Sequence, residues 1–509
     1  AIIDKIEKKL YLARDLNGEK PLYYGFINDN FIFSSGLRSI SYFPGFKKRI
    51  NKHALKYYLD FSYVPEPFSI FENIKKLEKN SYLEFDLKKK QIIKIRKYNV
   101  EIQDQIFNLN YQSDYLSNLN NVLSNSVEIS MTSDVEVGSF LSGGTDSSLI
   151  TAIMQSISNR NIKTFSVAVE DRKYNEKQYS RAISKYLKTD HNEIEVTEKN
   201  FIEQAKIVSE IYEEPFGDSS QIPTSLISKF ASSKVKVILS GDGADEFFGG
   251  YNRYIGIQKS SKYFKYLPYF IRNLLGKLLS LLPENFINLI ELILIKLILS
   301  NTSSNRIYEK LVKLKSMLIH CKRQDDIYNL ILKNFESEST TVLINQKNDF
   351  DKDIELKILS LINSSRENHE NMMKIDQEFY LPNDILTKVD RASMYYSLET
   401  RMPFLNPNLI EFSKRIPKNL LLNNGKGKII LKDLLKKYIP KEYVDRPKMG
   451  FSVPIDNWLR GSLSTWAKDI LDERKINKFG VLKSSKVKEM MQMHSKNKRN
   501  YGTQLWNII

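Results

Sequence analysis

Cysteine is nearly absent from this chain, since Cys321 is the only one among 509 residues. One thiol cannot form an intrachain disulfide, which excludes the disulfide-stabilised secreted domains. A bilayer-spanning run is also lacking, because the densest apolar stretch, Leu267 to Leu299, is interrupted by Arg, Lys and Glu residues. The chain opens with Ala1-Ile2-Ile3-Asp4 and shows no signal peptide. These absences predict a cytoplasmic protein without a transmembrane segment.

The apolar stretch predicts two amphipathic helices that divide near Pro283, with membrane-surface contact as the alternative. Basic residues are plentiful: 77 Lys and Arg stand against 60 Asp and Glu, giving a net charge of +17. Clustered cations would indicate a nucleic-acid partner. Here the lysines are scattered through amphipathic segments, so we predict no nucleic-acid binding. A homodimer is kept as an open alternative for the assembly.

Residues 1–98 are rich in residues typical of β-strands, with Asn-Gly and Asn-Asp turns between the runs. The following segment, 99–114, is polar and without clear periodicity, so it is our predicted linker. The predicted strands of the first part are Lys9 to Ala13, Leu22 to Phe26, Asn30 to Phe33, Ser81 to Leu87 and Gln91 to Tyr98.

Residues 115–509 have a different pattern, in which helical and strand-like segments alternate. Such alternation predicts a doubly wound α/β domain with a parallel sheet. Residues 255–509 are predicted to be largely helical. The predicted strands are Val135 to Leu141, Thr164 to Val169, Glu193 to Val196 and Val235 to Leu239, and the predicted helices are Tyr115 to Val127, Leu149 to Ile157, Glu176 to Leu187 and Ser219 to Ser232.

A glycine-rich loop, Ser142-Gly143-Gly144-Thr145-Asp146-Ser147-Ser148, lies between the first of these strands and a helix. Glycines at a helix amino terminus let backbone N–H groups approach an anion, and the helix dipole favours negative charge there. No lysine follows the glycines, so this is not the common P-loop. Asp146 would repel a phosphate unless a cation lay between them. The loop therefore predicts a phosphate site with Mg²⁺.

A second glycine loop, Ser240-Gly241-Asp242-Gly243-Ala244-Asp245-Glu246, also follows a predicted strand. Loops at the carboxyl ends of parallel strands meet in one crevice, so we expect both loops to face one ligand. One of the three acids can bind a metal while another acts as a base. Helix capping by Asp242 or Asp245 is the alternative reading.

The loop SGGTDSS resembles the pyrophosphate motif of N-type ATP pyrophosphatases, and together with SGDGADEFFGGY it resembles the synthetase domain of asparagine synthetases. Residues 388–394, 398–405, 425–428 and 446–451 resemble later segments of that family. Residues 14–24 resemble the late part of a class II glutaminase domain. The resemblance implies that residues 1–98 are a remnant of an antiparallel β domain of the glutaminase type, which is an α+β fold, and that 115–509 are the ATP pyrophosphatase domain.

The resemblance also implies a reaction. ATP converts the aspartate side-chain carboxylate to an acyl-adenylate, and ammonia, derived from glutamine, then gives asparagine, AMP and pyrophosphate. Asp146 and Asp245 are the implied Mg²⁺ ligands. Asp242 stands where the family has a glutamate base, and Lys428 matches a lysine that offsets phosphate charge. The implied ATP and pyrophosphate site consists of Leu141, Ser142, Gly143, Gly144, Asp146, Ser147, Ser148, Val167, Ser240 and Gly241.

The family's amino-terminal cysteine nucleophile has no counterpart here, because the sequence starts at Ala1 and Cys321 lies in the helical region. We therefore expect a fragment that uses free ammonia but does not hydrolyse glutamine. Residues 214–224 resemble the acceptor region of short bacterial relatives, which leaves open a uronic-acid sugar as the acceptor, or the cyclisation of an amino-acid derivative. An RNA-modifying enzyme and a non-catalytic nucleotide-binding relative are the remaining alternatives.

Overall fold

The computed structural model describes residues 1–99, 112–169, 177–258, 267–281, 315–322, 353–362, 368–423, 425–445 and 453–509, with single positions between 328 and 344. Most of the predicted linker, the second predicted helix after Pro283 and residues 446–451 lie outside these ranges. The chain divides into two units. The first comprises Ala1–Tyr58, Ser62–Tyr251 and Met373–Pro454, and the second Leu59–Phe61, Asn252–Met372 and Ile455–Ile509.

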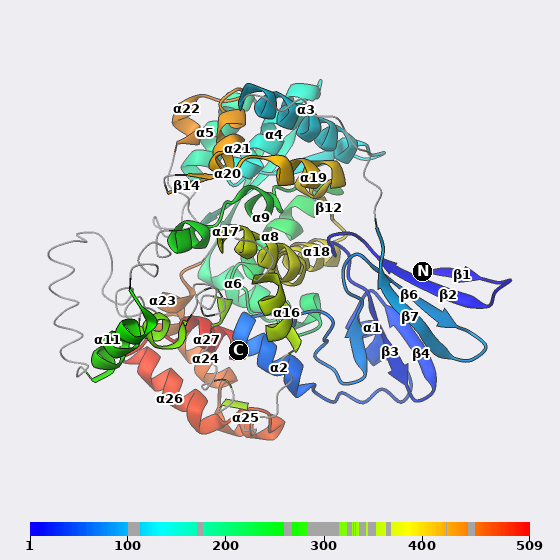
Figure 1. Ribbon diagram of the computed structural model, residues 1–509, viewed down its shortest axis with the longest axis vertical. Coiled ribbons are helices and arrows are strands. Elements are labelled where there is room, and N and C mark those ends of the chain that lie inside the picture. The colour runs from blue at the N-terminus through cyan, green and yellow to red at the C-terminus, as the bar shows by residue number, and fades with distance from the viewer. Residues whose placement is uncertain are drawn as a thin grey trace. The chain divides into compact units, whose positions relative to one another are not determined.

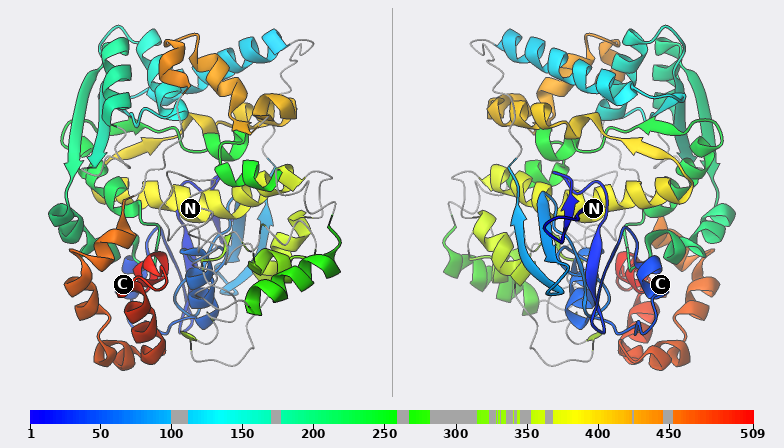
Figure 2. Two further views of the ribbon diagram at one scale, coloured as in Figure 1. Left: turned by 90° about the vertical axis from the view of Figure 1, so that its left-hand side faces the viewer. Right: turned by 90° about the vertical axis from the view of Figure 1, so that its right-hand side faces the viewer.

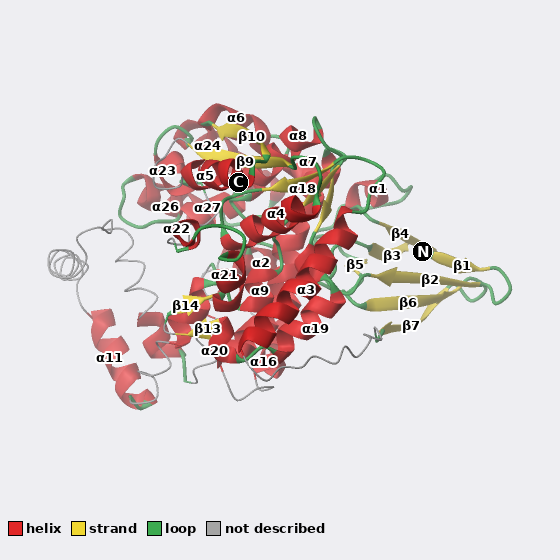
Figure 3. Ribbon diagram, turned by 90° about the horizontal axis from the view of Figure 1, so that it is seen from above, coloured by secondary structure: helices red, strands yellow, loops and turns green. Residues whose placement is uncertain are grey.

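Two antiparallel sheets form the amino-terminal part of the first unit (Figures 1 and 3). One has the order β1-β2-β6-β7 and the other β4-β3-β5. Their apolar faces share a core in which Phe31 stacks on Phe85 with ring centroids 4.2 Å apart. All five predicted strands of this region are confirmed. The bounds are β1 Ile2–Asp4, β2 Lys9–Arg14, β3 Tyr23–Ile27, β4 Asn30–Ser34, β5 Ile74–Lys76, β6 Ser81–Asp86 and β7 Gln91–Lys97.

Two helices lie between the strands of residues 1–98, in agreement with the α+β character that the resemblance implies, although neither helix was predicted. Leu37–Ser41 forms helix α1 and Lys52–Phe61 forms helix α2. The side chain of Asn51 accepts hydrogen bonds from two N–H groups of the first turn of α2, which is a standard capping signal. Eight of the ten residues of α2 are buried. Ala54, Leu55 and Leu59 favour a helix. Two tyrosines and a phenylalanine favour strands, so burial and intrinsic preference both contribute to the helical state.

A five-stranded parallel sheet of order β10-β9-β8-β11-β12 forms the centre of the remaining part of the first unit. This confirms the predicted α/β class with an additional antiparallel β region. The fifth strand, β12 at Glu399–Arg401, lies within the region 255–509 that is predicted to be largely helical, and it was not predicted. The remaining strands are β8 Val137–Phe140, β9 Lys163–Val169, β10 Asp190–Val196 and β11 Val237–Leu239.

Strand β12 was missed because it has three residues and no alternating pattern. Its pairing with β11 runs over Val237, Ile238 and Leu239 and extends the sheet on that side. The segment reaches the sheet only through tertiary contacts, since α18 packs against both β12 and α8. A strand whose position depends on distant elements leaves little signal in a sequence window.

Helices cover the parallel sheet, and Figure 2 shows α4 beside α3 and α21, in agreement with their contacts. Predicted helices at α3, α4, α5 and α8 are confirmed. The helices of this region are α3 Gln112–Met131, α4 Thr145–Ile157, α5 Lys177–Leu187, α6 Glu198–Ala205, α7 Val208–Tyr212, α8 Gln221–Ser232, α9 Ala244–Phe248, η1 Asp376–Ile385, α18 Leu386–Tyr395, η2 Pro403–Leu405, α19 Pro407–Arg415, α20 Lys418–Leu421, α21 Ile429–Leu435 and α22 Lys441–Val444, with a short hairpin of β13 Leu422–Asn423 and β14 Lys426–Gly427.

The second unit is helical in its described part. Cys321 is buried there and forms no disulfide, and its carbonyl accepts a hydrogen bond from Arg272 at 2.8 Å. Among the described residues, no helix combines the length and apolar character needed to cross a bilayer. The remaining helices of the chain are α11 Tyr269–Leu281, α16 Asp353–Ile362, α17 Asn368–Ile375, α23 Ile455–Arg460, α24 Ser464–Ile470, α25 Glu473–Phe479, α26 Ser484–Ser495 and α27 Gly502–Ile508.

Candidate functional site

The first glycine loop turns the chain from β8 into α4. Gly143 has a φ of +76°, and a Cβ there would lie 2.9 Å from the backbone nitrogen of Ser180, so the position requires glycine. The hydroxyls of Ser142 and Ser147 are 3.0 Å apart, and Gly144 N–H donates to Ser142 Oγ at 3.2 Å. Gly144 caps α4 without a side-chain hydrogen bond. The first turn of α4 therefore keeps N–H groups that suit an anion.

The second glycine loop touches the first. A Cβ on Gly241 would lie 2.8 Å from Cβ of Asp146 and 2.9 Å from the backbone nitrogen of Ser147. These distances are shorter than ordinary contacts, so only glycine lets the two loops approach so closely. Gly243 caps α9 with a φ of +92°. The two loops thus meet at one edge of the sheet, as the parallel topology predicts.

Lys428 joins the two loops at one charged centre. Its ammonium lies 2.6 Å from a carboxylate oxygen of Asp245 and is paired with Asp146 as well. Burial alone would lower the pKa of Lys428, yet the two carboxylates outweigh that effect and raise it. Lys428 is 5% exposed, so it is not one surface lysine among many. It stays charged and offsets two negative groups.

The backbone around Lys428 is shaped for this position. Lys428 has a φ of +55° and caps α21, directly after the β13–β14 hairpin. A Cβ on Gly250 would lie 2.0 Å from Cε of Lys428 and 1.8 Å from a carboxylate oxygen of Asp245. A Cβ on Gly427 would lie 2.3 Å from the carbonyl oxygen of Gly249. The glycines therefore let the lysine stem pass against the backbone.

Asp146 and Asp245 are the described carboxylates that suit a divalent cation. In the described part of the chain, no group of three or more His, Cys, Asp or Glu side chains converges. Mg²⁺ is usually bound by one or two carboxylates together with phosphate oxygens and water. Two carboxylates beside a loop suited to phosphate match that donor set. The residues therefore fit Mg²⁺ delivered with a nucleotide.

Asp242 lies in the second loop, next to this centre. Its carboxylate accepts a hydrogen bond from Ser240 Oγ at 2.5 Å. Burial raises its pKa, while Ser240 and the charge of Lys388 oppose the rise. A raised pKa brings a carboxylate closer to the range in which it can accept a proton from a substrate near neutral pH. The arrangement is suited to a general base.

Glu246, the third acid of the loop, has a different environment. It is 1% exposed, and burial, followed by the nearby charge of Asp245, raises its pKa to about 8. The hydroxyl of Tyr251 lies 2.6 Å from Oε1 of Glu246. A carboxyl group that is mostly protonated at neutral pH is a poor metal ligand. Of the three acids of the loop, Asp245 therefore suits a metal ion and Asp242 suits a base, while Glu246 suits neither role.

Of the remaining predicted residues, Leu141 directly follows β8, Val167 lies in β9 and Ser148 lies on α4. Leu141 is fully buried, and its N–H donates to the carbonyl of Phe165 at 2.8 Å. Val167 is partly buried against a core cluster that includes Phe165. Ser148 is fully buried on α4, and its hydroxyl has no partner among the described residues. The adenine-lining role of Leu141 and Val167 stays a prediction.

Two charged residues near Asp242 had no predicted role. Lys388 on α18 donates to Asp218 at 2.8 Å, and both side chains are largely buried. Asp218 belongs to the segment that resembles an acceptor region, and Lys388 belongs to a segment that resembles the family. Sequence alone placed both in matching segments but gave no reason to pair residues 170 positions apart.

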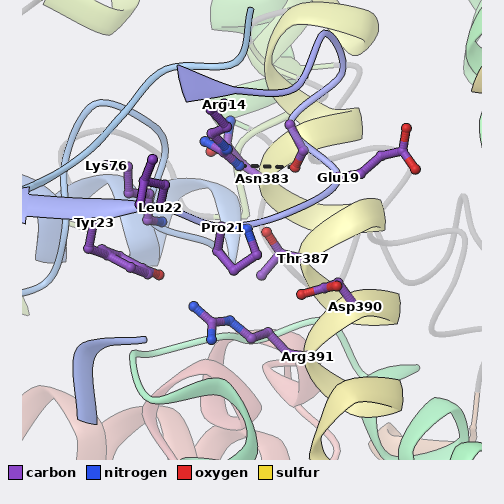
Figure 4. A pocket seen from close by; sticks show the side chains of 11 residues that line it. Arg14, Glu19, Pro21, Leu22, Tyr23, Lys76, Asn383, Thr387, Asp390 and Arg391 are labelled. Atoms are coloured by element: carbon purple, nitrogen blue, oxygen red, sulfur yellow. Dashed lines mark hydrogen bonds between the residues drawn. The ribbon is translucent and has the colours of Figure 1, made fainter. Parts of the chain in front are cut away.

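A separate pocket lies between the amino-terminal sheets and α18 within the first unit (Figure 4). Arg391, Thr387 and Asp390 extend into it from the helix, opposite Tyr23 and Pro21. The guanidinium of Arg391 lies 5.6 Å from the ring centre of Tyr23, within the range of a cation–π contact. This pocket is polar, and none of the predicted site residues lines it.

Comparison with known proteins agrees with the resemblance. Residues 118–509 match the Asparagine synthase family, and residues 1–99 match the Glutamine amidotransferase domain. Asparagine synthetase [glutamine-hydrolyzing] 1 of Bacillus subtilis is 28% identical over 516 residues, which cover 100% of this chain and 75% of that protein.

Two further relatives show the same pattern. A putative asparagine synthetase [glutamine-hydrolyzing] 2 of Methanocaldococcus jannaschii is 37% identical over 280 residues, covering 54% of this chain and 53% of that protein. A putative asparagine synthetase [glutamine-hydrolyzing] of Mycobacterium bovis is 28% identical over 517 residues, covering 100% of this chain and 74% of that protein. With the family match extending over residues 118–509, the chain belongs to the asparagine synthase family.

Proposed function

We propose that this chain catalyses ATP-dependent amide formation on the side-chain carboxylate of aspartate. A carboxylate oxygen attacks the α-phosphorus of ATP, and pyrophosphate leaves. Ammonia then attacks the acyl carbon of the acyl-adenylate, and AMP leaves with the bonding electrons. The products are asparagine, AMP and pyrophosphate. Adenylation is needed because a free carboxylate resists nucleophiles until one of its oxygens becomes part of a good leaving group.

The observation that carries the proposal is the convergence of two glycine loops on Lys428. Backbone N–H groups of the first turn of α4 suit the pyrophosphate end of ATP. Ser142 and Ser147 add hydroxyl donors beside these groups. Lys428 supplies a buried positive charge for the negative charge that grows on the leaving pyrophosphate. Such preorganised charges act most strongly where water is excluded.

Asp146 and Asp245 are the residues that we assign to Mg²⁺. When bound, the ion neutralises part of the phosphate charge and screens the nucleotide from the two carboxylates. Lys428 already contacts both carboxylates, so the chain itself holds them in fixed positions before a nucleotide binds. The two carboxylates are thus held ready as oxygen ligands for the ion.

Asp242 is the proposed base for the second half of the reaction. Ammonia loses a proton after it attacks the acyl carbon, and a buried carboxylate with a raised pKa can accept that proton. Ser240 orients the carboxylate through a 2.5 Å hydrogen bond. The match of residues 1–99 to the Glutamine amidotransferase domain supports glutamine as the source of the ammonia.

Acceptor-dependent release of pyrophosphate tests this function. The full chain is incubated with Mg·ATP, ammonium chloride and either aspartate or glucuronate. We expect pyrophosphate, AMP and asparagine in equal amounts with aspartate, and background release with glucuronate. Asp146→Ala should lose Mg·ATP binding while keeping its far-UV circular dichroism. Release that is independent of aspartate, or that requires the sugar acid, would overturn the aspartate assignment.

A further inference from the structure

Lys388 is a buried lysine with spare hydrogen-bonding capacity. It is 9% exposed, and its ammonium donates to Asp218 at 2.8 Å. This is the only hydrogen bond from that ammonium to a described residue. An ammonium group has three N–H donors, so two are left for a ligand or water. Buried donors in a purely structural pair are normally satisfied by the protein itself.

Lys76 and Lys79 are two other buried lysines of the same unit, and they allow a comparison with Lys388. Lys76 is 8% exposed and reaches both the carbonyl of Val64 and the carboxylate of Glu214, each at 2.5 Å. Lys79, also 8% exposed, donates to the carbonyl of Gln377 at 2.8 Å and pairs with a glutamate. Each has two partners. Lys388 differs because it is equally buried but has only one.

Three separate elements bring Lys388 to its position. Asp218 lies in the turn before α8 and accepts hydrogen bonds from both the N–H and the hydroxyl of Ser220, each at 2.8 Å. The backbone carbonyl of Lys388 accepts a hydrogen bond from Tyr212 at 3.2 Å. Burial would raise the pKa of Asp218, but Lys388 and Ser220 outweigh that effect and lower it. The ion pair is thus fixed from both sides.

The proposed base Asp242 lies close enough for its charge to act on Lys388, and the same is true in reverse. Among the described residues, the carboxylate of Asp242 has one hydrogen-bond partner, the hydroxyl of Ser240. Asp218 and Asp384 are the other acids that act on Lys388, while Asp245 and Lys428 also act on Asp242. A buried cation and a buried carboxylate, each with unused hydrogen-bonding capacity, therefore lie within electrostatic range of each other.

We propose that Lys388, held by Asp218, is the positioning residue that binds the carboxylate of the acceptor beside Asp242. This inference rests on the proposed function. Its ligand class is an anionic carboxylic acid, because an ammonium with two spare donors pairs with a carboxylate. Asp218 contributes by keeping the lysine stem in one place, so little side-chain entropy is lost when the acceptor binds.

Steady-state kinetics of the full chain test the inference. Lys388→Met keeps the length of the side chain and removes its charge, whereas Lys388→Arg restores the charge. We expect Lys388→Met to raise KM for aspartate about 10- to 100-fold, since a hydrogen bond to a charged group is lost. The Kd for Mg·ATP should stay within about twofold of the wild type. Lys388→Arg should recover part of the aspartate affinity.

Lys79→Met is the matched control, since it removes an equally buried lysine whose partners are structural. It should leave KM for aspartate unchanged in the fraction that folds. A second readout is the pH profile of ammonia-dependent turnover at constant free ammonia. Lys388 opposes the rise in the pKa of Asp242, so its removal should move the acidic limb to higher pH. This shift reports only that the charge of Lys388 acts on Asp242, so the KM for aspartate is the readout that tests acceptor binding.

The outcomes separate the two proposals. A wild-type chain that releases no pyrophosphate in response to aspartate or glucuronate overturns the proposed function and this inference with it. A wild type that responds to aspartate, with Lys388→Met showing the same KM for aspartate, overturns the inference alone. If Lys388→Met does not fold, Lys388→Arg decides, because an unchanged KM with a longer, differently shaped cation also contradicts precise positioning by this residue.

Discussion

The ammonium of Lys428 lies 2.6 Å from a carboxylate oxygen of Asp245 and is also paired with Asp146, which comes from the other glycine loop. A residue 282 positions beyond Asp146 in the chain thus holds the two loops together through charge. The same two carboxylates are the proposed ligands of Mg²⁺. Lys428 and the ion therefore act on the same negative groups, and the removal of one should increase the effect of the other.

Lys428→Met should destabilise the protein because two neighbouring carboxylates lose their buried counter-charge. We expect a loss of about 3 kcal/mol in the free energy of unfolding in EDTA. Millimolar Mg²⁺ without nucleotide should restore a large part of that loss in the variant and shift the wild type much less. Urea unfolding with EDTA or Mg²⁺ measures both effects.

Lys163→Met is the control for Lys428→Met, since Lys163 pairs with Glu136 at the protein surface. An exposed ion pair contributes little, so this variant should change stability by less than about 1 kcal/mol and show no special response to Mg²⁺. If Mg²⁺ stabilises wild type, Lys163→Met and Lys428→Met equally, Asp146 and Asp245 are not the site of the ion.

Gly241→Ala should separate the two glycine loops. The new Cβ would lie 2.8 Å from Cβ of Asp146 and 2.9 Å from the backbone nitrogen of Ser147, and backbone atoms cannot move aside cheaply. We expect a loss of about 1–3 kcal/mol in stability and at least a tenfold weaker Kd for Mg·ATP. Thermal unfolding and nucleotide titration measure the two effects.

Gly256→Ala serves as the matched control for Gly241→Ala. A Cβ at Gly256 would meet no atom within 4 Å. The residue is helical, so alanine should leave stability unchanged or raise it by about 0.5–1 kcal/mol. Nucleotide affinity should not change. If both variants bind Mg·ATP as the wild type does, close contact between the loops is not required for nucleotide binding.

The central parallel sheet and the meeting of the two glycine loops could be predicted from the sequence. Strand, glycine loop and helix follow one another locally at residues 137–157 and again at 237–248, and parallel topology then brings the loops to one edge. Helix α2 was not predicted because its residue preferences are mixed: Ala54, Leu55 and Leu59 favour a helix, whereas its two tyrosines favour strands. Strand β12 is three residues long and depends on its pairing with β11.

The ion pairs of the site were beyond sequence reasoning for a physical reason. Lys428 was a candidate only through family resemblance, since one lysine among 77 basic residues has no local signature. Its contact with Asp146 arises because the β13–β14 hairpin places it against Gly250. The pairing of Lys388 with Asp218 likewise depends on how α18 packs against α8. Long-range contacts of this kind are set by tertiary packing.

Asp242→Asn should block the second half-reaction while leaving the first. The amide cannot accept the proton from ammonia, so we expect turnover to asparagine to fall about 100- to 10,000-fold. Aspartate-dependent exchange of labelled pyrophosphate into ATP needs only adenylation and should stay within a few-fold of the wild type. Product analysis and isotope exchange on the same preparation measure the two half-reactions.

Ser240→Ala is a milder test of the same role. The hydroxyl of Ser240 lowers the pKa of Asp242 against the effect of burial, so its removal should raise that pKa further. Asp242 must be ionised to act as a base, so the acidic limb of ammonia-dependent turnover should move to higher pH. For the Asp242→Asn variant of the preceding experiment, loss of the pyrophosphate exchange together with turnover would assign Asp242 to adenylation or binding instead.

Glu19, which lines the polar pocket beside α18, should make stability depend on pH. Burial, followed by the charge of Asp15, raises the pKa of Glu19 to about 7 from its ordinary value near 4.5. The folded state therefore binds this proton more tightly than the unfolded state does. Ionising the buried carboxyl lowers the stability of the folded state. This loss is absent below about pH 4.5, where Glu19 is protonated in both states. It grows as the pH rises and is complete above about pH 7.

Glu19→Gln removes this loss, so the variant should be more stable than the wild type by about 2 kcal/mol at pH 8.5 and nearly equal to it at pH 4.5. Urea unfolding at the two pH values measures the difference. Glu203→Gln, at an exposed position on α6, should show no such dependence. Only a difference in the pKa of Glu19 between the folded and unfolded states can make the effect of Glu19→Gln vary with pH. If the variant differs from the wild type by the same free energy of unfolding at both pH values, the carboxyl has the same pKa in both states, and the prediction is wrong.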